Sequence, residues 1–314
     1  MGHRLPDADS FGAAIGIYRA AKTLNKKAYI VIDNPTSSII PLMNTFSDNQ
    51  DYEADMFVNN HEAKEIMDDN TLLVVVDTNK PSITQCEDLL YMAKMIVVLD
   101  HHRQGSDTIR NSVLSYIEPY ASSASEMVAE ILQYFTEGIR IRNVEADSIY
   151  AGIMIDTDNF MQKTGVRTFE AAAFLRRCGA DVTRVRKLFR EDMNDYKARG
   201  ETIRNAELFR GQFAISECPS DYVDSPTVVG AQAANELLNI VGVKASFVLT
   251  EYKGVIYISA RAIDEVNVQI IMERMGGGGH LNIAGCQLEN TSVEEGIIVL
   301  KRTLDKMIEE GEIS

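Results

Sequence analysis

The chain has 314 residues, 45% of them hydrophobic, which is enough for two domains with a core each. Its net charge of −15 excludes the broad basic surface that duplex or long single-stranded nucleic acid requires, so any nucleotide must be held by local contacts. The four cysteines have no spacing typical of zinc or redox sites. Because we find neither a signal peptide nor an apolar run of membrane-spanning length, we expect a soluble, cytoplasmic polypeptide.

The first motif lies just before a predicted helix at 11–24. His3, Asp7 and Asp9 fall within one turn of the helix start, and Asp9 or Ser10 is placed to cap it. Alone, such acids are usually caps and such a histidine is usually exposed. A ligand at position 3 would also lie on a chain end that is expected to fray. The chain therefore looks like part of a longer one, with most of its first strand missing.

Strands and helices alternate over the first hundred residues. The expected elements are, in order, a strand at 27–33, helices at 38–46 and 60–67, a strand at 71–76, a helix at 89–93 and a strand at 95–99. Further helices are expected at 122–138, 143–156, 168–178 and 181–189, with Asn60 and Asn143 as caps of their helices. This alternation predicts an α/β fold, a doubly wound and mainly parallel sheet over residues 1–190.

Two of these strands end on metal-binding side chains. Asp77 follows the run at 71–76, and Asp100, His101 and His102 follow the run at 95–99. Open α/β folds place their ligand sites at the carboxyl ends of parallel strands, and Asp and neutral His are ligands for divalent cations. A polar loop would explain one histidine pair alone. The repetition at two strand ends favours a metal site.

Asp156 closes an apolar helix. A carboxylate at a helix C-terminus opposes the helix dipole, so we expect a positive charge beside it, most simply a metal ion. An exposed acidic C-cap is an equally good explanation until the other motifs are counted.

A smaller α/β domain is expected at 211–314, joined by a helical linker at 191–210 that consists of a long, mostly polar helix at 192–209. Its expected elements are strands at 213–216, 246–251 and 255–260, helices at 228–241 and 266–275, and a hairpin turn at 252–254. Four glycines then precede His280, and the backbone N–H groups of Gly277, Gly278 and Gly279 suit an anion. Arg261, at a strand end, is a second phosphate candidate. A flexible loop is the ordinary alternative for such a glycine run.

A doubly wound sheet would bring the acids and histidines of the first domain to one edge. The set comprises His3, Asp7, Asp9, Asp77, Asp100, His101, His102 and Asp156. This mixture suits two divalent cations that share a carboxylate, activate water and clamp a phosphorus centre during in-line displacement. No Ser or Cys beside a base indicates a covalent route.

These motifs together resemble the DHH phosphoesterase superfamily with its DHH-associated C-terminal (DHHA1) domain. The resemblance covers the whole chain and rests on His3-x-x-x-Asp7-x-Asp9, Asp77, Asp100-His101-His102, Asp156-Thr157 and Gly276-Gly277-Gly278-Gly279-His280. The segments 116–126, 163–170, 267–269 and 279–285 are similar to the GdpP branch, the cyclic-di-AMP phosphodiesterases. The resemblance implies manganese-dependent hydrolysis of cyclic di-AMP to the linear dinucleotide pApA.

The resemblance also implies a role for each site residue. One metal would be held by His3, Asp7 and Asp77, and the other by Asp9, Asp77, His101 and Asp156. Asp77 would bridge the two, Asp100 would orient a histidine, and His102 would lie beside the substrate phosphate. Arg261, Gly277, Gly278, Gly279 and His280 would hold phosphate and base. A homodimer, and a membrane-anchored parent protein of which this is the cytoplasmic catalytic module, are further implications.

Other functions stay open at this point. A nano-RNA exonuclease and pAp phosphatase of the oligoribonuclease type would use the same metals on linear substrates. An inorganic pyrophosphatase would have a different second domain, and a RecJ-like exonuclease would need a longer chain and a basic channel. A non-catalytic cyclic-dinucleotide sensor should lack a metal ligand, whereas none is missing here. The general acid is open as well, between a metal-bound water and His102.

Overall fold

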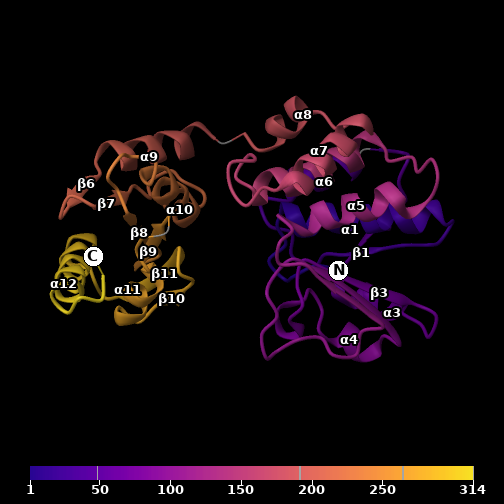
Figure 1. Ribbon diagram of the computed structural model, residues 1–314, viewed down its shortest axis with the longest axis horizontal. Coiled ribbons are helices and arrows are strands. Elements are labelled where there is room, and N and C mark those ends of the chain that lie inside the picture. Colours follow the sequence, from indigo (N-terminus) through magenta and orange to yellow (C-terminus); the bar gives the residue numbers. More distant parts are fainter. Residues whose placement is uncertain (48, 191, 264, 314) are drawn as a thin grey trace. The chain divides into compact units, whose positions relative to one another are not determined.

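The computed structural model describes residues 1–47, 49–190, 192–263 and 265–313, and the chain divides into two compact units, Met1–Arg190 and Glu191–Ser314 (Figure 1). The expected linker begins at Glu191 and the expected second domain ends at Ser314, and both residues lie outside the described ranges. Within those ranges, no helix combines the length and the apolar character that crossing a membrane requires.

Parallel strands form the sheets of the first unit. Strands β3 (Leu72–Val76), β4 (Met95–Asp100) and β5 (Leu114–Ile117) pair in that order, and the short β1 (Ile30–Val31) and β2 (Phe57–Val58) form a second parallel pair. The strand expected at 27–33 is therefore shorter than predicted. The backbone of Met1 extends the sheet at β3, since its amino group donates to the carbonyl of Val74 (2.8 Å) and its carbonyl accepts from Val76 (3.0 Å).

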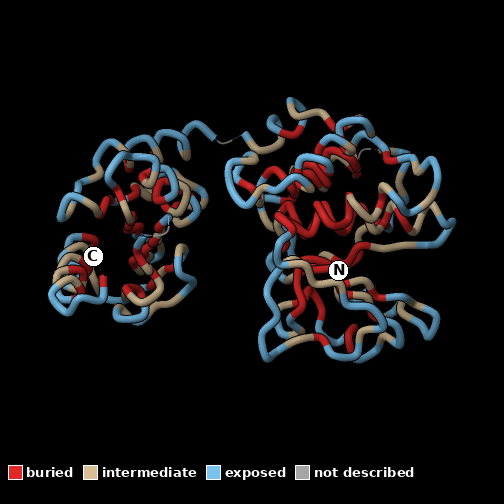
Figure 2. The backbone as a smooth tube through the Cα atoms, in the orientation of Figure 1, coloured by how far each residue is buried: buried red, intermediate tan, exposed pale blue. Residues whose placement is uncertain are grey.

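Helices cover both faces of this sheet, as Figure 1 shows. They are α1 (Ala8–Thr23), α2 (Ile40–Ser47), α3 (Asn60–Ile66), the 3₁₀ turn η1 (Pro81–Ile83), α4 (Asp88–Met92), α5 (Ala124–Phe135), α6 (Asn143–Asp156), α7 (Val166–Arg177) and α8 (Val182–Leu188). Side chains alternate along a strand, so Val76 and Leu99 join the core under α1, α5 and α6, whereas Val75 and Val98 join a second core on the other face (Figure 2). The predicted doubly wound α/β architecture is confirmed.

Three predicted helix caps were wrong by one to three positions. Asp7, not Asp9 or Ser10, caps α1, because its carboxylate accepts from the Ser10 N–H at 2.9 Å. Asn59 caps α3 in the same way, and α6 has Arg142 at its N-cap position. Because α1 begins at Ala8, Asp9 lies inside its first turn rather than at the N-cap, and it is buried.

The second unit is a mixed six-stranded sheet with helices. Its strands are β6 (Glu207–Phe209), β7 (Phe213–Cys218), β8 (Ala245–Tyr252), β9 (Val255–Ala262), β10 (Gly278–Gly279) and β11 (Ile283–Glu289), in the order β10-β11-β9-β8-β7-β6, and its helices are α9 (Met193–Arg204), α10 (Pro226–Leu237), α11 (Val268–Arg274) and α12 (Val293–Glu309). Only β7 and β8 run parallel. The helix predicted at 192–209 ends at Arg204, because β6 occupies its last residues, and α9 contacts α10 and β7. The predicted hairpin turn is present, with positive φ at Lys253 and Gly254.

Glycines allow α1, α5 and α6 to approach one another closely. A Cβ at Gly152 would lie 2.2 Å from the Ser125 hydroxyl oxygen and 3.0 Å from the Ala8 carbonyl, and one at Gly12 would lie 2.6 Å from the Ser148 carbonyl. This packing brings the start of α1 and the end of α6 to the carboxyl edge of the sheet.

We expect Gly152→Ala to lower the free energy of unfolding by about 1–3 kcal/mol, because the methyl group meets a backbone carbonyl that cannot yield freely. Gly105→Ala is the control, since no atom lies within 4 Å of its Cβ position, and it should change stability by less than about 0.5 kcal/mol. Urea unfolding measures both; equal effects would contradict the close packing.

Candidate metal centre

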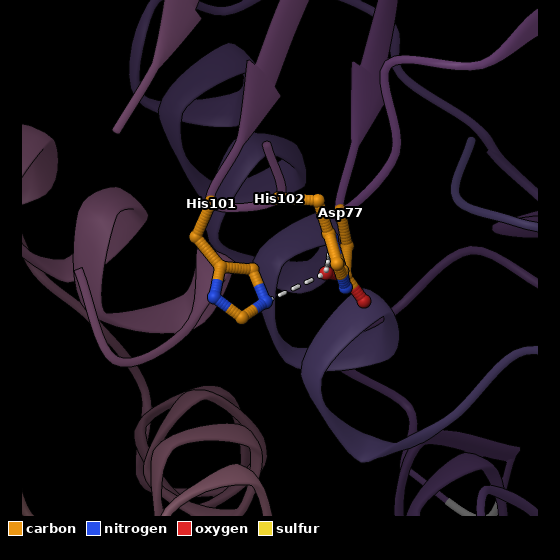
Figure 3. A group of neighbouring side chains, drawn as sticks. All are labelled: Asp77, His101 and His102. Carbon is orange, nitrogen blue, oxygen red and sulfur yellow. Dashed lines mark ion pairs between the residues drawn. The ribbon is translucent and has the colours of Figure 1, made fainter. Parts of the chain in front are cut away.

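Asp77 lies at the centre of a cluster at the carboxyl ends of β3 and β4. Figure 3 shows the Asp77 carboxylate facing His101 and His102, which follow the neighbouring strand. Its Oδ1 lies 3.3 Å from Nε2 of His101 and 3.6 Å from Nδ1 of His102. Asp77 is buried and has a left-handed backbone, with φ of 59°. Both histidines therefore approach one oxygen of a single carboxylate.

His3 reaches the same carboxylate from the amino-terminal segment. Its Nε2 lies 3.3 Å from Oδ2 of Asp77 and 3.5 Å from Oδ2 of Asp7. The segment does not fray: the Arg4 N–H donates to the Ile83 carbonyl (2.7 Å), and the Gln85 side chain donates to the His3 carbonyl (2.8 Å). The chain end is thus fixed by backbone and side-chain hydrogen bonds to the segment after β3.

Asp9 is positioned by the start of α5. Its two carboxylate oxygens accept from the N–H groups of Ala124 and Ser125, each at 2.7 Å, where the helix dipole favours negative charge. From there Asp9 Oδ2 lies 3.8 Å from Nε2 of His101, and Asp156 Oδ2, at the end of α6, lies 3.7 Å from the same atom. Helices distant in sequence thus place two acids around one imidazole.

The ligand atoms of the cluster fall into groups that suit metal ions. His3, Asp7 and Asp77 form one group, and Asp9, His101 and Asp156 form another, with atoms within 4.8 Å of one another in each. Asp77 also groups with His101 and His102. Among the described residues, Asp77 Oδ1 and Asp156 Oδ2 are buried without a hydrogen-bond donor. Unpartnered buried carboxylate oxygens are costly, so a bound cation fits these residues.

Burial and mutual repulsion shift the pKa values of the cluster. Burial raises the pKa of Asp9, and the charges of Asp77 and Asp156 raise it further. Burial also raises the pKa of Asp156, although the positive charges of His101 and Lys163 oppose it. Burial alone would lower the pKa values of the histidines, but the surrounding carboxylates prevail and raise that of His3 to about 10 and that of His101 to about 9. The cluster therefore retains protons where it has no cation.

Asp100 is occupied by hydrogen bonds and directs His102. It is fully buried, and its Oδ2 accepts from the Asn79 side chain at 2.5 Å. Its Oδ1 lies 2.8 Å from Nδ1 of His102 and accepts from the His102 N–H at 3.1 Å. A proton on Nδ1 would leave Nε2 as the free nitrogen of a side chain that is 58% exposed.

Two functional neighbours were missed from the sequence. Asn79 could have been found, because it lies two residues after Asp77 at the same strand end. Gln85 could not, because no motif contains it and its importance arises from contacts with His3 and, through the Asp33 N–H, with the end of β1.

The predicted phosphate contacts lie in the second unit. Arg261 is on β9, beside β11, and β10 with Gly278 and Gly279 lies on the other side of β11. The Nε of Arg261 is buried without an acceptor among the described residues, and burial lowers the pKa of its guanidinium. A Cβ at Gly277 would lie 2.2 Å from the Gly285 carbonyl, so close packing on β11 already requires glycine there. His280 follows β10 and is exposed.

Comparison with known families identifies two domains. Residues 1–153 match the model of the DHH family, N-terminal domain, and residues 213–310 match the DHHA1 domain.

Individual relatives agree with these matches. The chain is 43% identical to the cyclic-di-AMP phosphodiesterase GdpP of Bacillus subtilis, over 99% of this chain and 48% of the relative, and 39% identical to the cyclic-di-AMP phosphodiesterase PdeA of Listeria monocytogenes, over 94% and 45%. It thus spans about half the length of these curated relatives. The crystal structure of an exopolyphosphatase-related protein from Bacteroides fragilis shares the fold, with a TM-score of 0.79, 22% identity and coverage of 98% of this chain and 91% of that one.

We expect the metal-free protein to lose stability as the pH rises from 6.5 to 9. The pKa values of His3 and His101 are raised from 6.5 to about 10 and about 9, so their stabilising protons are fully bound below pH 6.5 and leave as the pH passes through these values. Melting temperatures in EDTA should fall over this range, and Mn²⁺ should reduce the fall because it replaces the protons. In His101→Gln, the melting temperature in EDTA should depend less on pH. An unchanged dependence on pH would show that His101 is not a source of the loss of stability.

We expect Gln85→Leu to weaken Mn²⁺ binding about 10- to 100-fold, because the His3 carbonyl loses its side-chain donor. Gln133→Leu, on α5, is the control, since its side chain donates only to Tyr134, at 3.4 Å. Isothermal titration measures both affinities; equal affinities in the two variants would contradict a positioning role.

Proposed function

Because the chain belongs to the DHH family and carries a DHHA1 domain, we propose that it is a metal-dependent phosphodiesterase that hydrolyses cyclic di-AMP to linear pApA. The observation that carries this proposal is the convergence of acids and histidines on Asp77, where two buried carboxylate oxygens lack a donor. The choice of substrate is supported by the relatives in Bacillus and Listeria, which are cyclic-di-AMP phosphodiesterases.

We propose two cation sites that share Asp77. His3, Asp7 and Asp77 would hold one ion, and Asp9, Asp77, His101 and Asp156 the other. Two divalent cations, most simply Mn²⁺, would supply the positive charge that activates water and neutralises the phosphate. The chain's part is to fix the ligands beforehand: α5 holds Asp9, and the segment after β3 holds His3.

His102 is the proposed proton carrier. Asp100 keeps one imidazole nitrogen occupied, and the exposed Nε2 is free to meet the substrate. In this role His102, with both ring nitrogens protonated, would pass its Nε2 proton to the leaving 3′-oxygen as general acid and become a neutral imidazole that keeps its Nδ1 proton on Asp100. Asn79 fixes the orientation of the Asp100 carboxylate, because its side-chain amide donates to the second carboxylate oxygen.

The second unit is proposed to contribute substrate-binding groups of its own. Arg261 has an unused buried N–H, and the backbone of Gly277, Gly278 and Gly279 with His280 would contact phosphate and base. The product pApA, a homodimeric assembly and a membrane-anchored parent protein are parts of the proposal that rest on the family resemblance alone.

Purified protein with Mn²⁺ should convert cyclic di-AMP to pApA faster than it degrades pApA or cyclic di-GMP, as followed by chromatography. Asp77→Asn should lower turnover more than about a hundredfold, because it removes the shared ligand. Asp69→Asn, an exposed acid before the opposite end of β3, is the control and should keep wild-type activity. Faster cleavage of pApA would favour an oligoribonuclease, and binding without turnover would favour a sensor.

A further inference from the structure

The chain reverses direction directly after Asp156. Asp158, Asn159 and Phe160 all have left-handed backbones, with φ of 47°, 59° and 66°. Thr157 holds this turn, because its carbonyl accepts from the Gln162 N–H (2.9 Å) and its hydroxyl accepts from the Phe160 N–H (3.0 Å). Three consecutive non-glycine residues in this conformation are strained, and such strain gathers at functional sites.

The turn brings a lysine back to the candidate metal centre. Lys163 follows Gln162 and is itself left-handed, with φ of 53°. Its ammonium acts electrostatically on the Asp156 carboxylate, yet no carboxylate within the described ranges lies within 4 Å of it, and the side chain is exposed. Lys22, Lys64 and Lys94 of the same unit each pair with an acid. Lys163 is therefore a free positive charge beside the cluster.

The charge balance of the cluster leaves room for such a group. With both cations bound, Asp7, Asp9, Asp77, Asp100 and Asp156 would carry five negative charges against four positive ones on the cations. The phosphodiester adds a sixth negative charge, so negative charge would exceed positive charge even where His102 is protonated. An ammonium without a carboxylate partner can compensate it, because no competing ion pair must first be broken.

We propose that Lys163 binds a phosphate oxygen of the substrate beside the cation site formed by Asp9, His101 and Asp156. This inference rests on the proposed function for the identity of the substrate, although the same contact would bind any phosphate anion at the metal centre. The left-handed turn is then the device that returns the lysine to the end of α6.

The proposal predicts effects of opposite sign on two ligands. Removing the ammonium should weaken phosphate binding, because a charge-assisted hydrogen bond is lost. It should tighten Mn²⁺ binding, because a positive charge next to a cation site is lost. A lysine that only supports the turn would weaken both ligands when replaced.

The experiment compares Lys163→Met, Lys163→Arg and the wild type. Mn²⁺ affinity is measured by the electron paramagnetic resonance of the free ion, and inorganic phosphate affinity by calorimetry of the Mn²⁺-loaded protein. For Lys163→Met we expect phosphate binding about tenfold weaker or more, and Mn²⁺ binding severalfold tighter. Lys163→Arg should restore phosphate binding. Lys26→Met is the control, an exposed lysine after the far end of α1, about 24 Å along the helix from its start.

Weaker binding of both ligands in Lys163→Met, or no change in either, would overturn the proposal. Neither measurement uses cyclic di-AMP. If the wild type failed to hydrolyse cyclic di-AMP but the two affinities moved in opposite directions, the proposed function would fail and the phosphate contact would stand.

Discussion

The first unit depends on one electrostatic constraint, the gathering of several carboxylates at a largely buried sheet edge. Three of the acids are oriented by different parts of the fold. The N-terminus of α5 donates to Asp9, and Asn79 and His102 contact Asp100. The left-handed backbone conformation of Asp77 orients its own side chain. None of these supports neutralises the whole cluster. Protons on the histidines or bound cations must therefore compensate the negative charge of the cluster. The same groups can bind either protons or cations, so the two can replace each other.

The hydrophobic patterns of the sequence predicted most of the fold. The buried runs before Asp77 and Asp100 predicted the neighbouring strands β3 and β4, and their common direction placed both acids at one edge of the sheet. Helix starts were less predictable, because Asp7, Asp9 and Ser10 are all good caps and only side-chain reach selects Asp7. The end of the helix predicted at 192–209 was wrong for another reason: pairing with β7 outweighs local helix propensity.

The metal-binding residues of the candidate site were predictable from strand ends and helix ends, but most of the groups that hold them in place were not. Asp9 binds the start of α5, which lies more than a hundred residues later in the chain. Gln85 binds the carbonyl of His3, which is also distant in sequence, and no sequence motif links the two residues. The Asp9 contact depends on the close packing of α1, α5 and α6 around their glycines, and the Gln85 contact depends on the pairing of the amino-terminal segment with the segment after β3. A local signal exists for each ligand and for Asn79, which follows Asp77 at the same strand end, but none exists for Gln85 or for the start of α5.

At Asp77, the residue that would best stabilise the fold differs from the residue that a metal site would require. A left-handed backbone costs most residues roughly 1–2 kcal/mol, aspartate and asparagine less and glycine nothing, and a buried carboxylate oxygen without a donor costs more. Both penalties vanish with a substitution such as Asp77→Gly, which would also remove the ligand that the two proposed cation sites share. Selection of this unit for heat resistance alone would therefore favour replacement of the acid at position 77, so the stability of the fold does not explain why an aspartate is there.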